Sequence, residues 1–211
     1  LIQKSYKTWK YFKIHIITKI FFKIKFMPIK ELKREEFASW KYLKLSNIIL
    51  ENGRKYEVCS RTTKWWAVAW ILRHIEKKCF ILIKQYRYTL KDYVIELVAG
   101  IVDKDKHIDE IMKEEVIEET GYRDIVSMNY LLETSGSAWA FSETLHLYDI
   151  EITWEKYAQK LGSLEDIEVI EVPYDEIISF LENESINYVI DPKIGLWVIM
   201  IMGKIKEIPQ P

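Results

Sequence analysis

Three glutamates in one short acidic run have the spacing of metal ligands: Glu115, Glu118 and Glu119. Residues three and four apart in a helix lie on one face, so the three carboxylates are expected to project together. Two carboxylates about 4 Å apart repel by roughly 4 kcal/mol at an effective dielectric constant of 20. A hard divalent cation turns that repulsion into attraction through oxygen ligands. Taken alone, however, the helix favours the plainer interpretation of a solvated acidic face beside Lys113.

Two glycines flank the acidic run and change that interpretation. Gly100 precedes Glu115 by fifteen positions and Gly121 follows it by six. This spacing resembles the 23-residue Nudix box, which opens on a glycine and closes on an Arg-Glu-aliphatic-any-Glu-Glu-any-Gly run. Six positions match: Gly100, Glu115, Val116, Glu118, Glu119 and Gly121. The resemblance implies a Nudix hydrolase that uses Mg²⁺ or Mn²⁺ to split a pyrophosphate bond.

Two positions of the motif depart from the family pattern. Lys106 stands in place of its first glutamate and Glu114 in place of its arginine, which in the family orients the metal-binding glutamates. If Lys106 and Glu114 pair, they exchange the charges of the usual pair. The double swap Lys106→Glu with Glu114→Arg is then expected to restore or raise activity. The departures also support a second hypothesis, a degenerate Nudix fold that binds a nucleotide-sugar as a sensor or scaffold.

Residues 83–105 extend the likeness beyond the motif. They resemble the strand, loop and motif entry of the ADP-ribose and nucleoside diphosphate sugar pyrophosphatase branch. The resemblance implies that Arg87 contacts a substrate phosphate and that Glu96 contacts the substrate or a water on the metal. It makes the backbone carbonyl of Ala99 a metal ligand beside the motif glutamates.

Residues 164–177 resemble the loop of the same branch that delivers a catalytic glutamate, which falls on Glu165. The resemblance gives Glu165 the role of general base. It makes Glu118 both a metal ligand and a catalytic residue. The likeness covers residues 45–203, nearly all of the expected fold.

Substrate choice rests on loops that the motif does not encode. The branch often has Ser-Pro-Gly after the box, where this chain has Thr134-Ser135-Gly136. Ser135 and Gly136 are still assigned to substrate binding by the resemblance. The implied substrate class is a nucleoside diphosphate linked to a sugar, either ADP-ribose or another nucleotide-sugar. Residues 139–143 either line the sugar side of the site or pack as a loop.

Two short β-like runs within residues 45–62 flank the turn residues Asn52-Gly53, a strong indication of a hairpin. In the branch that the chain resembles, this element is exchanged between subunits. A homodimer is therefore expected, with Arg61 reaching the partner's site.

The remaining pattern predicts strands alternating with a few helices. Apolar runs indicate strands at 65–72, 79–86, 93–100, 125–132, 144–152 and 167–172. Helical spacing indicates helices at 107–120, 174–183 and 191–203, the last with Asp191 as its N-cap. We expect an α/β fold, a Nudix-type α/β/α sandwich with a mixed β-sheet and a small N-terminal β-hairpin element. The expected division is 1–26, 27–62 and 63–211.

Charge is distributed unevenly along the chain. Residues 1–26 carry seven lysines and no acid, so the remainder carries a net charge of −8 against −1 for the whole. An acidic body is a poor nucleic-acid binder and suits a protein that holds divalent cations. The basic segment is expected to be either extra upstream translation before Met27 or an amphipathic arm that touches anionic lipid.

No apolar run reaches the length of a membrane span. The two cysteines, Cys59 and Cys79, are expected to be buried free thiols of a cytoplasmic protein. The four histidines are expected to be structural or solvated. Trp65, Trp66 and Trp70 are expected in the core or at a dimer interface.

Overall fold

The computed structural model describes most of the chain that the sequence places in the fold. The described residues are 29–62, 66–102, 106–153, 156–163, 165–195 and 200. The expected extension 1–26, His15, Trp65 and most of the expected last helix lie outside them. By its internal contacts, the described chain divides into a small unit of 29–35 and 47–57 and a large unit of the other residues.

A three-stranded sheet is formed by the first strands of the chain. Its order is β1 (Glu31–Ser39), β2 (Leu43–Leu50) and β3 (Lys55–Arg61). At the turn, Gly53 has a φ of 78° and donates its N–H to the Leu50 carbonyl at 2.9 Å. The predicted hairpin is confirmed. Strand β1 was not predicted, because its mostly exposed side chains lack an apolar alternation.

The larger sheet has eight strands and is mixed, as the fold class requires. Strand β4 pairs in parallel with β9, and β11 pairs in parallel with β6, while the remaining pairs are antiparallel. The strands are β4 (Trp66–His74), β5 (Cys79–Arg87), β6 (Asp92–Glu96), β7 (Val98–Ile101), β8 (Asp124–Thr134), β9 (Thr144–Thr153), β10 (Ile167–Pro173) and β11 (Val189–Ile190).

The single strand predicted at 93–100 is wrong, because the run forms two strands on either side of Leu97. Strand β6 pairs with β5, where Glu96 faces Ile83, whereas β7 pairs with β4, where Ala99 faces Ala69. Strands β4 and β5 pair directly only near their shared turn. Residues 92–101 therefore pair first with β5 and then with β4. This places Glu96 beside β5 and Ala99 beside β4.

The predicted helix at 107–120 is confirmed, but its last turn is wider than expected. Helix α2 (Ile108–Glu115) continues directly into a π-helical turn, η1 (Val116–Thr120). Gly121 ends it with a φ of 80°, a conformation that glycine adopts without penalty. Single π turns inside α-helices occur frequently at functional sites.

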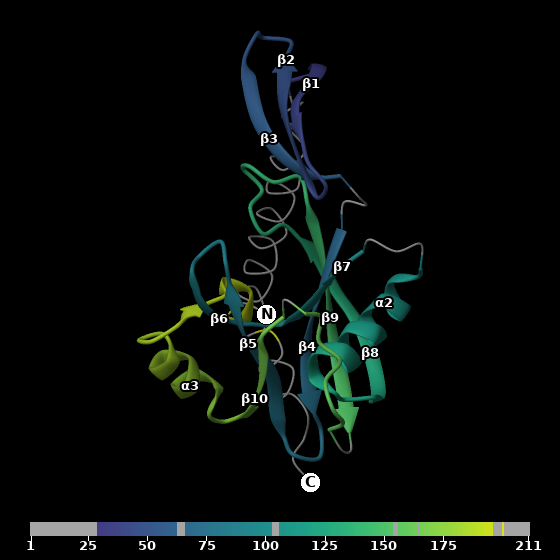
Figure 1. Cartoon of the computed structure of the whole chain (residues 1–211), viewed down its shortest axis with the longest axis vertical. Coiled ribbons are helices and arrows are strands. Elements are labelled where there is room, and N and C mark those ends of the chain that lie inside the picture. The colour runs from purple at the N-terminus through teal and green to yellow at the C-terminus, as the bar shows by residue number, and fades with distance from the viewer. Residues whose placement is uncertain are drawn as a thin grey trace, which may run out of the picture. The chain divides into compact units, whose positions relative to one another are not determined.

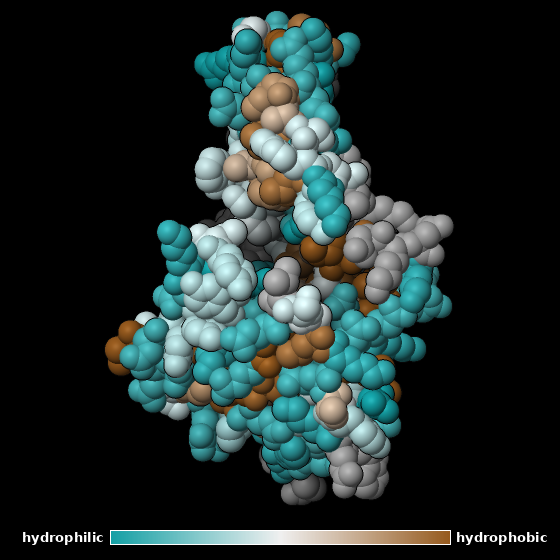
Figure 2. All heavy atoms as spheres, viewed as in Figure 1, coloured by the Kyte–Doolittle hydropathy of each residue, from teal (hydrophilic) through white to brown (hydrophobic). Residues whose placement is uncertain are grey.

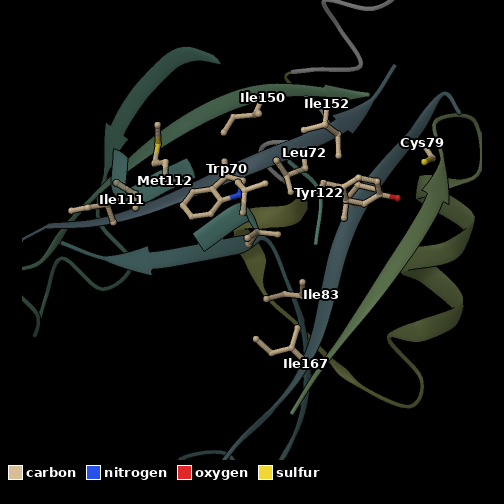
Figure 3. Close-up of a cluster of buried hydrophobic side chains, with 14 of the residues drawn as sticks. Trp70, Leu72, Cys79, Ile83, Ile111, Met112, Tyr122, Ile150, Ile152 and Ile167 are labelled. Atoms are coloured by element: carbon tan, nitrogen blue, oxygen red, sulfur yellow. The ribbon is translucent and has the colours of Figure 1, made fainter. Parts of the chain in front are cut away.

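Strand β4 sends alternate side chains into two separate cores. Val68, Trp70 and Leu72 pack on the side of α2 and η1, where Ile111 and Met112 lie beside Trp70 (Figure 3). The side chains between them pack toward α3 (Ile177–Glu184) and the short helical stretch at 192–195. Helices α2 and α3 lie on opposite sides of the central strands (Figure 1). This arrangement confirms the α/β/α sandwich.

On the face seen in Figure 2, hydrophobic residues lie scattered among hydrophilic ones. None of the described helices is long and apolar enough to cross a membrane. Cys79 is buried and Cys59 is half-buried, and both are free thiols.

Gly121→Ala is expected to lower the free energy of unfolding by more than about 3 kcal/mol. A Cβ at this position would lie 2.1 Å from the Tyr157 carbonyl oxygen and would also strain the left-handed backbone. Gly53→Ala is the matched control, because Gly53 has the same backbone conformation and nothing within 4 Å of a Cβ. It should cost about 1 kcal/mol. Equal losses in denaturant titration would contradict a role for the contact with Tyr157.

Candidate active site

One cavity of about 450 Å³ collects most of the residues that the sequence assigns to the site. Its wall contains five glutamates, which are Glu96, Glu115, Glu119, Glu143 and Glu165, and three cationic side chains, which are Arg61, Arg87 and Lys193. The backbone of β7, the end of α2 and strand β5 form much of the remaining wall. Acidic and cationic side chains that converge on one cavity are typical of a site for a charged ligand.

Glu119 is the most unusual acid of the cavity. Its residue is 7% exposed, and its Oε2 is buried without a hydrogen-bond partner. Burial raises the pKa of Glu119 to about 8, and the neighbouring charges of Glu115 and Glu165 add to the increase. A hydrogen bond from the Ala99 backbone and the charge of Arg87 act in the opposite direction. A buried, repelled and partly unbonded carboxylate is a group that a cation would stabilise.

Glu115 reaches the same cavity across the backbone of β7. A Cβ at Gly100 would lie 2.6 Å from Cγ of Glu115 and 2.9 Å from its Oε1. Only a residue without a side chain allows this approach. The glycine that opens the motif therefore makes room for one of its glutamates.

The Ala99 backbone faces the same carboxylates. Its N–H hydrogen-bonds Glu119. In a β-ladder the N–H and C=O of one residue point to the same edge, since paired residues exchange both groups. The Ala99 carbonyl therefore points to the edge of β7 on which Glu119 lies.

Glu118 does not join Glu115 and Glu119. It is exposed and does not line the cavity. The wide η1 turn explains the difference, because each residue in it rotates the chain by less than in an α-helix. Glu119, four residues after Glu115, therefore returns to the side of the helix that faces the cavity. Glu118, three residues after Glu115, points away from it. The expected common face of three carboxylates is thus reduced to two.

Arg87 and Glu96 form a bidentate ion pair at the cavity wall. The Arg87 guanidinium donates to the two Glu96 carboxylate oxygens at 2.6 and 2.5 Å. This pair holds the pKa of Arg87 above its ordinary value. A planar guanidinium suits phosphate as well as carboxylate, so Arg87 is held in an orientation from which it can contact an anionic ligand.

Glu165 lines the cavity from the loop before β10. Its carboxylate accepts the backbone N–H of Gly162 at 2.6 Å. Next to it, Asp166 accepts the Tyr93 hydroxyl at 2.8 Å. The loop is therefore fixed on both sides of a carboxylate that remains exposed to water.

Arg61 lines the cavity, where it pairs with Glu143. The expectation that it reaches a partner's site stays a prediction. The end of β3 bonds to the chain before Glu143, since Cys59 and Ala140 are joined at 2.8 Å, and this draws Arg61 inward. Trp139 is 76% exposed and lines neither described cavity.

A second cavity of about 500 Å³ adjoins the first. The two share Arg87, Glu96, Gly136 and Lys193. Ser135 lines the second cavity, and its buried hydroxyl has no hydrogen-bond partner. The Arg87–Glu96 ion pair therefore forms part of the wall that the two cavities share.

Several residues of the wall were missed by sequence reasoning. They include Gln85 and Lys193, whereas Glu143 belongs to the stretch 139–143 that was offered for the sugar side of the site. Gln85 is a buried amide in β5, shortly after the apolar run Cys79–Ile83, and this position is the indication that the sequence offered. Lys193 follows the predicted N-cap Asp191, which accepts the Lys193 backbone N–H at 2.8 Å and pairs with its ammonium group.

The donor set fits a hard divalent cation. Glu115, Glu119 and the Ala99 carbonyl offer only oxygen, the ligand type that Mg²⁺ and Mn²⁺ prefer, and one Glu119 oxygen has no partner. In the part of the chain that the structure describes, no three Asp, Glu, His or Cys side chains form a metal cluster. A cation here would therefore combine two carboxylates with backbone and ligand oxygens.

Lys106 and Glu114, the two departures from the motif, form an ion pair. Both side chains are partly exposed, so the pair belongs to the class of surface salt bridges. The pair spans the loop before α2 and the last turn of that helix, next to Glu115. The hypothesis that the two residues exchange the charges of the usual pair is consistent with this contact.

Two curated bacterial proteins are similar to this chain over most of its length. A GDP-mannose pyrophosphatase of Cronobacter sakazakii is 31% identical over 164 residues, which is 70% of this chain and 83% of the relative. A GDP-mannose pyrophosphatase of Escherichia coli is 28% identical over 172 residues, which is 74% of this chain and 87% of the relative. No family model matches the chain.

The fold is also similar to that of a solved structure described as an ADP compounds hydrolase. The TM-score is 0.63 at 17% identity, covering 85% of this chain and 96% of the other. At this identity the likeness concerns the fold alone.

In chelator, Glu119→Gln is expected to melt at a higher temperature than the unsubstituted protein at pH 8, but not at pH 5. The folded-state pKa of about 8 exceeds the ordinary 4.5, so the stability that this carboxyl contributes is lost as the pH rises between those values. Glutamine carries no charge and avoids that loss. Glu110→Gln, at an exposed position of the same helix, is the control. An equal melting temperature at both pH values would contradict the burial of a charged Glu119.

Lys106→Glu and Glu114→Arg are each expected to destabilise the protein slightly, because each places two like charges together. The double swap should recover the loss, with a coupling energy of about 0.2–1 kcal/mol in a double-mutant cycle. Additive effects would show that the pair contributes nothing. Restored or increased turnover in the double swap would extend the exchange of charges to activity.

Proposed function

The chain belongs to the Nudix hydrolases, in their branch of ADP-ribose and nucleoside diphosphate sugar pyrophosphatases, and on that premise we propose that it hydrolyses the pyrophosphate bond of a nucleotide-sugar. The products are a nucleoside monophosphate and a sugar phosphate. GDP-mannose is the first candidate substrate, since it is the one that both relatives are named for.

The observation that carries the proposal is that Glu115 and the buried Glu119 lie close together in the wall of a cavity that Arg87 also lines. Glu115, Glu119 and the Ala99 carbonyl would hold Mg²⁺ or Mn²⁺. When bound, the metal supplies positive charge to the diphosphate and lowers the pKa of a nearby water. Without a cation, the two acids would repel the anionic substrate that the arginine attracts.

The side chains of the cavity account for the rest of the reaction. Glu165 accepts a proton from the attacking water, whose oxygen forms a bond to phosphorus while the bridging P–O bond breaks. Arg87 donates to a phosphate oxygen, and Glu96 keeps its guanidinium in the required plane. Lys193 adds a second positive charge at the junction of the two cavities. Charge neutralisation and positioning are the main requirements of phosphoryl transfer.

The two adjoining cavities suit a substrate with a group on each side of a diphosphate. The diphosphate would lie at the junction formed by Arg87 and Lys193. The second cavity, with Ser135 and Gly136 in its wall, would hold one of the two attached groups. Its volume lies within the range of pockets that bind small molecules.

A homodimer in the cytoplasm is the proposed state of the enzyme. Large hydrophobic side chains exposed on β1 and on its connection to β2 support an interface there: Leu32, Phe37, Trp40 and Tyr42. Free cysteines suit a reducing compartment. Sedimentation of the full chain tests the dimer, which a monomer at micromolar concentration would rule out.

The full chain is expected to release nucleoside monophosphate from GDP-mannose in the presence of Mg²⁺ or Mn²⁺. The assay compares GDP-mannose, ADP-ribose, UDP-glucose and a dinucleoside polyphosphate, with chelator as the blank. Glu119→Gln should reduce kcat at least about 100-fold, because it removes a carboxylate that would hold the cation. Glu110→Gln on the same helix is the matched control and should retain full turnover.

Binding of one of these compounds without release of any product would contradict hydrolysis. It would favour the degenerate fold that acts as a sensor or scaffold. Release from ADP-ribose alone would keep the reaction and replace the first candidate substrate.

A further inference from the structure

The backbone of η1 is bonded to a segment that lies about forty residues later in the chain. The Glu118 carbonyl accepts the Lys160 N–H at 2.9 Å, and the Gly121 carbonyl accepts the Tyr157 N–H at 3.0 Å. The last carbonyls of a helix have no partner within it. Segment 156–160 therefore caps the turn that carries Glu119.

Gln159 adds a side-chain contact between these two backbone bonds. Its amide nitrogen donates to the Glu119 carbonyl and, at 3.2 Å, to the Ile167 carbonyl. A primary amide has two N–H groups, so one side chain can satisfy both acceptors. Gln159 thereby connects the backbone of Glu119 with the first residue of β10.

In the sequence, Glu165 lies between Gln159 and Ile167. The contact from Gln159 to Ile167 closes the base of the loop that contains Glu165. Glu165 accepts the Gly162 N–H inside the same loop. The start of β10 is held to the sheet by Lys84, which pairs with Glu168 at 2.5 Å, and the loop itself is held by Tyr93, whose hydroxyl donates to Asp166. The loop is thus anchored to the sheet on one side and to the acidic helix on the other.

We propose that Gln159 is a positioning residue that fixes the Glu165 loop relative to the turn carrying Glu119. The proposal rests on the proposed function, in which the two carboxylates act on one substrate from different elements. Within the described chain, Gln159 joins these two elements through the hydrogen bonds of its side chain. Glu165 itself is exposed, and its carboxylate accepts the Gly162 N–H within its own loop.

The physical reason is the short range of proton transfer. A general base must lie within hydrogen-bond reach of the proton that it accepts. A displacement of about 1 Å can cost 100-fold in rate. Loss of the Gln159 contacts leaves the covalent chain and the capping backbone bonds in place, so a partial displacement of the loop is expected.

The test replaces Gln159 with methionine, which has a similar length and no N–H group. Gln159→Met should lower kcat roughly 10-fold and leave KM within about twofold, since the phosphate-binding residues are untouched. Lys160→Met is the matched control. It removes a neighbouring exposed side chain and keeps the backbone bond to Glu118, so its kcat should equal that of the unsubstituted enzyme.

A double-mutant cycle with Glu165→Gln separates positioning from general damage. If Gln159 acts through Glu165, Gln159→Met should have almost no further effect on kcat once Glu165 is glutamine. An equal additional loss in that background, or an unchanged kcat in the single variant, would overturn the proposal.

Amide hydrogen exchange gives a readout that does not need turnover. Gln159→Met should speed exchange of peptides covering 161–167 and leave peptides of β4 unchanged. If the unsubstituted enzyme has no turnover, the proposed function fails while exchange still tests the anchoring of the loop. Unchanged exchange at 161–167 would overturn the role of Gln159 on its own.

Discussion

The carboxylate of Glu119 is buried beside that of Glu115, and much of the surrounding structure serves to keep it there. A buried ion costs several kcal/mol even after relaxation, unless a charge of opposite sign lies next to it. The protein provides only partial compensation through the Ala99 N–H and the charge of Arg87. In the proposed function a cation would complete this compensation, and without one the rest of the fold has to offset the local cost.

The apolar side chains buried in the two cores, one on each side of the sheet, offset the cost of burying Glu119. Burying one large apolar side chain contributes roughly 1.5–3 kcal/mol, and strand β4 alone supplies several to both faces. Trp70 and Tyr122 are among the largest side chains with almost no exposure, and Figure 3 shows both in the cluster that contains Met112. The acidic turn is thus fixed on a rigid layer, and the more exposed loop of Glu165 faces it across the cavity.

The sequence was sufficient to predict much of the fold, because the hydrophobic periods of most strands and of α2 are long and regular. The flanking glycines also predicted the motif, since Gly100 and Gly121 stand where a side chain would collide. The split of 93–100 into two strands could not be predicted, because both halves are apolar and only the divergence of β4 from β5 separates them.

The placement of Glu118 shows a different limit of sequence reasoning. Spacing within a helix assumes a regular turn, whereas η1 is widened in a context where residues 157–160 cap its carbonyls. The ion pair of Arg61 with Glu143 has a similar setting, since a bridge between Cys59 and Phe141 joins the two segments nearby. Both features arise from contacts between segments far apart in the chain, and a local pattern does not encode such contacts.

The parallel pairing of β4 with β9 has a consequence for the order of assembly. It joins residues 66–74 to residues 144–153, so a long stretch of chain must close before the centre of the sheet exists. The acids of α2 and η1 lie inside that stretch, and Glu165 lies beyond it. The cavity that these acids line is therefore complete only when β9 and β10 have joined the sheet, so the site forms late in folding.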